Sequence, residues 1–239
     1  MHMLRVDNSS NGIKKNLFIK LFILINLLLV LLLLSVSVVY SLDRCEDYVQ
    51  PIRTAYFKYF GVDFPYWYGV GCAKAESNCR QNIVSFDQGI GLFQLTPSTG
   101  IIKDIEKGLK ERIDPYILKD NIKGHAYWMS YIWNKNMELK TIIVKGRVVN
   151  VQDYVARCGK KLSDMYIMYN GGWWYMYEAS FTTSCDKQEI IKYCKRKKIP
   201  LKNDKILDLC EVNYSYADKI YKFSIPYRLS NKDSNLFKY

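Results

Sequence analysis

Histidine is scarce in this sequence, whose 239 residues contain only His2 and His125. Protein zinc sites are built from histidine and cysteine at short spacings, and the seven cysteines include no Cys-x-x-Cys pair. A nucleotide-binding fingerprint is also missing, because Gly89 and Gly91 follow no predicted strand and suit a turn instead. We therefore expect neither a metal nor a cofactor.

The sequence also lacks internal repeats, long low-complexity tracts and a linker between domains. Hydrophobic residues make up 49% of the chain and charged residues 24%. A chain of this length and composition can form one packed domain with appendages, but it is too short for two large domains. We expect a single domain.

Acidic residues are in deficit, with 23 Asp and Glu against 35 Lys and Arg, which leaves a net charge of +12. A positive surplus attracts polyanions, and outside the cytoplasm these are wall polymers and anionic lipid rather than nucleic acid. A compositional bias toward lysine, asparagine and isoleucine explains the charge equally well. The charge alone therefore assigns no partner.

One long apolar run lies near the N-terminus, from Leu21 to Val39, interrupted only by Asn26 and a few serines. As a helix it could cross about 30 Å of hydrocarbon. Lysines precede the run and acidic residues follow it, so the N-terminus is expected in the cytoplasm and the rest of the chain outside. A cleaved signal peptide and a retained anchor both fit, and the length of the run favours the anchor.

These observations divide the chain into four expected parts. They are a cytoplasmic basic tail (1–20), a signal peptide or transmembrane anchor (21–41), one extracytoplasmic domain (42–230) and a C-terminal tail (231–239).

All seven cysteines follow the apolar run, in a compartment where disulfides persist. The number is odd, so at least one thiol is unpaired within the chain. If Cys72 and Cys79 shared one helix, their Cα atoms would be about 10 Å apart, beyond the roughly 7 Å that a disulfide tolerates. Bridges are therefore expected mainly among Cys45, Cys158, Cys185, Cys194 and Cys210.

The spacing of apolar residues and the capping residues predict a mostly helical domain. Helices are expected at 48–60, 63–77, 97–112, 120–140, 151–170 and 216–227. Residues 85–91 suit a turn or short hairpin, and the β-branched residues of 141–151 suit a hairpin around Lys145-Gly146. Residues 180–212 contain basic residues 195–198, which are expected in a solvated loop.

Glu76 is an acidic residue near the end of the otherwise apolar helix predicted at 63–77. A carboxyl held against small apolar residues loses hydration, which raises its pKa and keeps a proton available near neutral pH. Such a group can act as a general acid. The alternative is that Glu76 faces water or pairs with Lys74 or Arg80.

Ordered blocks of residues decide between these alternatives. The blocks Ala75-Glu76-Ser77, Gly91–Pro97, Asp114–Tyr127 and Met168–Gly172 resemble, in order and spacing, the motifs of the soluble-lytic-transglycosylase-like family of the lysozyme-like superfamily. A closing segment, Tyr216–Ile220, lies where the last helix of that family begins. The resemblance covers about residues 48–228.

The resemblance implies an all-α, lysozyme-like fold with at most a small β-hairpin, and an enzyme that cuts peptidoglycan glycan strands. It makes Glu76 the catalytic residue, acting first as acid and then as base to form a 1,6-anhydro sugar without water. It also implies that Ser77, Gln94 and Tyr169 line the glycan groove and that Asn170 supports the site. Possible partners include an envelope-spanning machine.

Two other functions stay open. Asp87 could hold a water and make the protein a hydrolytic lysozyme, although Asp so close before a glycine is also a common turn residue. A noncatalytic glycan-binding or scaffold protein is the other alternative, because Phe93, Gly171 and Gly172 depart from the family pattern.

The remaining aromatic residues and the histidine have simpler interpretations. His125 is expected on a helix surface, and Trp128 and Trp133 are expected in the core. Trp173 and Trp174, beside Tyr169, are candidates for the wall of the groove.

The topology can be tested with a reporter fused after Tyr239. Because lysines precede the apolar run and acidic residues follow it, a reporter that works only outside the cytoplasm is expected to be active. If only a reporter that works in the cytoplasm were active at this position, the assigned orientation would be wrong.

Overall fold

In a computed structural model of the chain, the described residues are 22–29, 44–134, 138, 140–196, 198–200 and 206–228. The chain forms two compact units, Met1–Arg44 and Cys45–Tyr239. In the first unit residues 22–29 are helical with exposed side chains. The predicted basic tail (1–20), the remainder of the apolar segment 21–41 and the C-terminal tail (231–239) lie outside the described residues. Where the chain is described, none of its helices has the length and apolarity to span a membrane.

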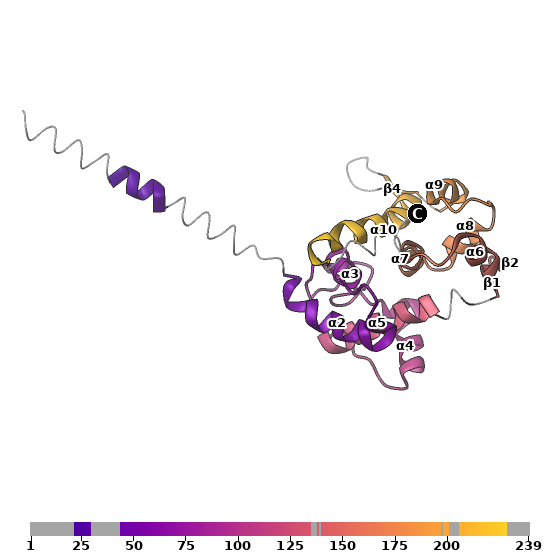
Figure 1. The fold of residues 1–239 in the computed structure, drawn as a ribbon, viewed down its shortest axis with the longest axis horizontal. Coiled ribbons are helices and arrows are strands. Elements are labelled where there is room, and N and C mark those ends of the chain that lie inside the picture. The colour runs from indigo at the N-terminus through magenta and orange to yellow at the C-terminus, as the bar shows by residue number, and fades with distance from the viewer. Residues whose placement is uncertain are drawn as a thin grey trace, which may run out of the picture. The chain divides into compact units, whose positions relative to one another are not determined.

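The second unit is mostly helical, as predicted, and has two small antiparallel sheets (Figure 1). Its α-helices are α2 (Glu46–Phe60), α3 (Trp67–Ser77), α4 (Ile101–Leu109), α5 (Leu118–Asn134), α6 (Val151–Cys158), α7 (Leu162–Gly171), α8 (Trp174–Ala179), α9 (Lys187–Ile190) and α10 (Leu209–Ser224). Short 3-10 helices are η1 (Pro97–Thr99), η3 (Ile191–Tyr193) and η4 (Ile225–Tyr227). The strands are β1 (Thr141–Val144), β2 (Arg147–Asn150), β3 (Lys198–Pro200) and β4 (Ile206–Asp208).

The predicted hairpin is confirmed. Strands β1 and β2 pair antiparallel, with Val144 opposite Arg147. Lys145 and Gly146 between them both have positive φ, of 50° and 73°. Positive φ at both central residues is characteristic of the two-residue turn whose twist matches a hairpin. The β3–β4 pair was not predicted; it lies in the region from 180 to 212, next to the Cys194–Cys210 disulfide.

Several predicted helices have different limits, and three of the differences have a clear local cause. The helix expected at 151–170 is two helices, because Gly159 has a φ of 74° and ends α6. The helix expected at 97–112 is divided at Gly100, where φ is 82°. The last helix begins at Leu209 rather than 216, since Asp208 Oδ1 accepts a hydrogen bond from the Cys210 backbone N–H at 2.9 Å.

Helix α3 occupies the core and packs against both α2 and α10 (Figure 1). Two glycines allow this approach. A Cβ at Gly69 would lie 2.6 Å from the Tyr56 ring of α2, and a Cβ at Gly71 would lie 2.6 Å from the Ile220 carbonyl oxygen of α10. The small residues of α3 therefore fix how closely its neighbours pack.

The disulfides correct one expectation. The bonds are Cys45–Cys79, Cys158–Cys185 and Cys194–Cys210, and Cys72 is a buried free thiol. Cys79 was left out of the predicted set, but α3 ends at Ser77, and positive φ values at Asn78 and Cys79 turn the chain toward the start of α2. Cys72 and Cys79 do not pair, as predicted. Three disulfides are consistent with an extracytoplasmic protein.

Peptide mapping without reduction tests this pairing. We expect three linked peptide pairs, and alkylation of Cys72 only after unfolding, because its side chain is fully buried. A linked Cys72 peptide, or rapid alkylation of Cys72 in the folded protein, would contradict the structure.

Candidate active site

Glu76 is the second-last residue of α3, at the point where this helix meets α10. Its side chain is partly buried, and Oε1 accepts a hydrogen bond from the hydroxyl of Tyr216 on α10. Lys219, three residues further along α10, donates to the carbonyl oxygen of Ala75 at 3.0 Å. The two helices thus place one hydroxyl and one ammonium group beside the carboxyl group.

Burial raises the pKa of Glu76 from 4.5 to about 7. The hydrogen bond from Tyr216 and the positive charge of Lys219 lower the pKa, and the charge of Asp87 raises it. Desolvation is the largest of these effects, so the environment favours the neutral form. A carboxyl that still holds its proton near pH 7 has the property that a general acid needs.

His125 lies behind this carboxyl and not on the helix surface, so that expectation is wrong. Its side chain is fully buried, its ring stacks on Phe93 at a centroid distance of 3.6 Å, and burial lowers its pKa. The spacing of apolar residues along α5 could have predicted that His125 is buried. Ile122, Ala126 and Met129 form the buried face of α5, and position 125 belongs to that face.

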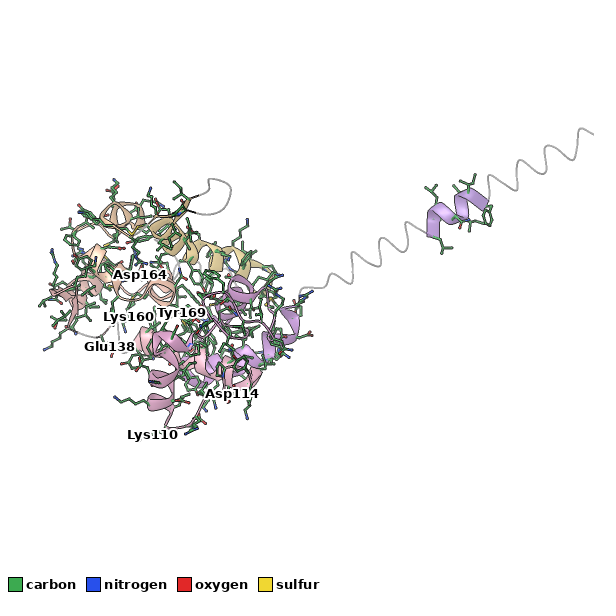
Figure 2. All side chains as sticks on the ribbon, turned by 180° about the vertical axis from the view of Figure 1, so that it is seen from behind. Lys110, Asp114, Glu138, Lys160, Asp164 and Tyr169 are labelled. Atoms are coloured by element: carbon green, nitrogen blue, oxygen red, sulfur yellow. A yellow bond between two sulfur atoms is a disulfide. The ribbon has the colours of Figure 1, made fainter. Side chains whose placement is uncertain are left out.

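Tyr169 joins the end of α7 to the segment Gly91–Pro97. Its hydroxyl donates to the Phe93 carbonyl oxygen at 2.8 Å, and its ring contacts His125 edge-on at 5.0 Å. Burial and the nearby charge of Glu76 raise the pKa of Tyr169. It lies in the middle of the unit, whereas Lys110 lies at its edge (Figure 2).

Ser77 is buried and faces a turn rather than a groove. Its hydroxyl donates to the Leu92 carbonyl oxygen at 2.8 Å and accepts from the Arg80 backbone N–H at 3.1 Å. These contacts hold the Ser77 side chain against the backbone of two neighbouring turns. Asn121 supports the turn at Leu92, because its Oδ1 accepts from the Phe93 backbone N–H at 2.9 Å. The sequence analysis included Asn121 in the block Asp114–Tyr127 but did not predict its contact with this turn.

Gln94 lies in this turn in the left-handed region, with a φ of 51°. Its Nε2 donates to the Gly91 carbonyl oxygen at 2.7 Å. A Cβ at Gly89 would lie 2.9 Å from Gln94 Oε1 and 3.0 Å from Gln94 Cβ, so a larger residue there would displace the Gln94 side chain. The partly buried side chain of Gln94 therefore packs over the turn.

Asp87 is exposed in the adjacent turn, and its Oδ1 accepts a hydrogen bond from the Ser85 hydroxyl. The Gly89 backbone N–H donates back to Ser85 Oγ at 2.9 Å. The turn expected at 85–91 is thus present, and Asp87 helps to close it. Its carboxylate is nevertheless close enough to influence Glu76 electrostatically.

A groove of about 830 Å³ lies among α4, α5, β1 and the end of α7. Its aromatic lining residues are Tyr127, Trp128, Tyr131, Tyr169 and Trp173, and its polar ones include Asp104, Lys107 and Asn170. Glu76 does not line this groove, but Tyr169 belongs both to the groove and to the surroundings of Glu76. The candidate site therefore has a carboxyl group next to an aromatic-lined groove.

The positions of the tryptophans agree only in part with the prediction. Trp128 packs against the core as expected, and it also lines the groove, where it stacks on Tyr131 at 5.4 Å. Trp173 lines the groove as expected. Trp174 is not among the lining residues, and Lys145 lies over its ring at 4.3 Å.

Asn170 supports the wall of the groove. Its Nδ2 donates to Asn213 Oδ1 at 3.1 Å, and a Cβ at Gly171 would lie 2.2 Å from Asn213 Nδ2. The glycine at 171 therefore leaves the space that Asn213 fills. Arg196, expected in a solvated loop, is largely buried and lies 3.5 Å from Glu178 Oε1.

Within the described residues, His, Cys, Asp and Glu form no cluster that could hold a metal ion. Comparison of the chain with known protein families and with curated proteins finds no match.

The raised pKa of Glu76 predicts a pH-dependent stability difference between wild type and Glu76→Gln. Below about pH 4.5 the carboxyl of Glu76 is protonated in both the folded and the unfolded wild type. Between about pH 4.5 and pH 7 it stays protonated in the folded state and loses its proton in the unfolded state. The wild type therefore loses stability as pH rises through this window, by on the order of 2–3 kcal/mol, and the amide variant does not.

Urea unfolding of both proteins between pH 4 and pH 8 measures this difference. Other buried acids, such as Asp164, titrate in both proteins and cancel. A difference that stays constant from pH 4 to pH 8 would show that folding does not raise the pKa of Glu76, and would contradict this prediction.

Proposed function

We propose that this protein is a peptidoglycan lytic transglycosylase of lysozyme-like fold, with Glu76 as its general acid and then its general base. The observation that carries the proposal is the desolvated carboxyl of Glu76, whose pKa is raised to about 7. At neutral pH a large share of such carboxyl groups is protonated, and the group can both donate and accept a proton.

Convergence of distant segments on Glu76 supports this role. Ser77 contacts Leu92, Tyr169 contacts Phe93, and Asn121 contacts Phe93, each through a hydrogen bond of 2.8–2.9 Å. Tyr216 donates to the carboxyl itself. All four belong to the segments on which the family resemblance rests. Ser77, Tyr169 and Asn121 meet at the Leu92–Phe93 backbone beside the end of α3, and Tyr216 contacts the carboxyl.

In the proposed reaction Glu76 gives its proton to the glycosidic oxygen while the bond from that oxygen to C1 of N-acetylmuramic acid breaks. The carboxylate then takes the proton of the sugar's own 6-hydroxyl as its oxygen bonds to C1. The product is a 1,6-anhydro end, and Glu76 regains its proton. One carboxyl suffices, whereas glycoside hydrolases ordinarily use two.

The groove suits a glycan. Aromatic faces offer flat apolar surfaces for sugar rings, while Asp104, Lys107 and Asn170 offer polar contacts to hydroxyl and amide groups. We assign the glycan strand to this groove, with the scissile bond beyond Tyr169 toward Glu76.

One observation favours a hydrolytic lysozyme as a second candidate, because the Asp87 carboxylate is close enough to raise the pKa of Glu76. A hydrolase needs such a carboxylate to activate a water or stabilise an intermediate. Asp87 is instead engaged by the Ser85 hydroxyl in a surface turn, and this contact favours the transglycosylase.

The proposed location is the cell envelope, with the N-terminal apolar segment as anchor or export signal. Three disulfides support work outside the cytoplasm, and the net charge of +12 is compatible with attraction to anionic wall polymers there. Local cutting of glycan strands there would open space for an envelope-spanning machine.

Digestion of purified sacculi by wild type, Glu76→Gln and Asp87→Asn tests the proposal. The wild type is expected to release anhydromuramic ends, which are one water lighter than reducing ends. Glu76→Gln keeps the shape but lacks the transferable proton, so turnover is expected to fall by at least about 10²- to 10⁴-fold. Asp87→Asn is expected to keep most activity.

Mass spectrometry of the released muropeptides separates the alternatives. Reducing ends from wild type together with an inactive Asp87→Asn variant would identify a hydrolase. Binding to sacculi without either product would identify a glycan-binding scaffold.

A further inference from the structure

A continuous chain of buried polar groups runs from Glu76 into the core. The Tyr216 hydroxyl donates to Glu76 Oε1 and lies 3.3 Å from Cys72 Sγ. Cys72 Sγ lies 3.5 Å from His125 Nε2, and His125 Nδ1 lies 3.3 Å from the Tyr56 hydroxyl. The four side chains behind Glu76 come from α2, α3, α5 and α10, and each of them is buried.

Counting hydrogens gives this chain a direction. A tyrosine hydroxyl has one hydrogen. When Glu76 is ionised its carboxylate can only accept, so Tyr216 uses that hydrogen toward Glu76. The contact between Tyr216 and Cys72 then requires the thiol to donate its S–H to the Tyr216 oxygen. With its own hydrogen committed, Cys72 can only accept from His125.

The same count fixes the tautomer of His125. Burial disfavours the charged imidazole, so one ring nitrogen carries a hydrogen and the other accepts. Nε2 must carry it in order to donate to Cys72, which leaves Nδ1 to accept from the Tyr56 hydroxyl. All four hydrogen bonds therefore point toward Glu76.

We infer that Tyr56, His125, Cys72 and Tyr216 form a one-way hydrogen-bond chain that keeps Glu76 Oε1 an acceptor and so places the transferable proton on Oε2. Tyr56, His125 and Cys72 are positioning residues, since they act on Glu76 only through Tyr216.

The catalytic consequence rests on the proposed function. The Oε2–H bond breaks as the proton moves to the glycosidic oxygen, and Oε2 regains a proton from the 6-hydroxyl. If Cys72 could not donate, the Tyr216 oxygen would lack a donor, and neutral Glu76 could turn its own proton inward, from Oε1 to that oxygen. This arrangement is unproductive because no proton faces the substrate.

The tautomer of His125 can be measured without any substrate. In the full-length His2→Gln variant, labelled with ¹⁵N-histidine, His125 is the single imidazole. A spectrum correlating ring hydrogens with ring nitrogens distinguishes the protonated nitrogen from the unprotonated one. We expect hydrogen on Nε2 and none on Nδ1, and hydrogen on Nδ1 would overturn the inference.

Variants at Cys72 test the effect on catalysis. Cys72→Ala removes the donor and is expected to lower kcat about three- to tenfold with KM unchanged, the range for one neutral hydrogen bond. Cys72→Ser keeps one donor and one acceptor and is expected to restore kcat. Val70→Ala is the control, because Val70 is fully buried on α3 and its apolar side chain makes no hydrogen bond.

The outcomes separate the two proposals. Equal loss of kcat in Cys72→Ala, Cys72→Ser and Val70→Ala would mean that Cys72 only fills space, which overturns the inference. An Nε2–H tautomer in a protein without glycan cleavage would reject the proposed function and leave the direction of the chain supported. If the alanine variant fails to fold, the tautomer in the unaltered core and the serine variant decide.

Discussion

The packing of α3 between α2 and α10 is the constraint on which the site depends. Gly69 and Gly71 let the neighbouring helices approach to distances that a side chain would block. The resulting close packing excludes water from the end of α3, and Glu76 is located there. The raised pKa of its carboxyl is therefore a consequence of helix packing, with desolvation outweighing the hydrogen bond and the lysine charge that favour ionisation.

The buried polar groups behind Glu76 form hydrogen bonds with one another. A thiol, an imidazole and two hydroxyl groups from four helices satisfy one another behind Glu76. A second set lies at α7, where the buried carboxylate of Asp164 accepts hydrogen bonds from Tyr154 and Tyr175 at 3.0 and 2.7 Å. Buried networks of this kind are stable only when each member is paired, so they define one arrangement of the surrounding helices.

Covalent links hold the segments around this core. Cys45–Cys79 ties the start of α2 to the chain just after Glu76, and Cys194–Cys210 joins the loop of Arg196 to the start of α10. Arg196 in turn donates to the Gly171 carbonyl oxygen at 3.4 Å, at the groove wall. The disulfides thus restrain the two segments that flank the carboxyl and the groove.

Local patterns were sufficient for the helical class, the β1–β2 hairpin, the desolvated setting of Glu76 and the turn containing Asp87. Periodicity, turn residues and an isolated acid in an apolar helix all act over a few residues. They were not sufficient for His125 and Cys79, or for the place of Trp128 in the groove wall, because the surroundings of these residues come from segments distant in sequence. His125 is buried because α5 packs on α2 and α7, and Cys79 pairs with Cys45 because α3 ends two residues earlier. The sequence by itself singled out Glu76 as the candidate acid and named the segments expected around it. Tertiary structure decided the protonation of Glu76 and the direction of the hydrogen bonds behind it, since both depend on desolvation and on partners brought together by folding.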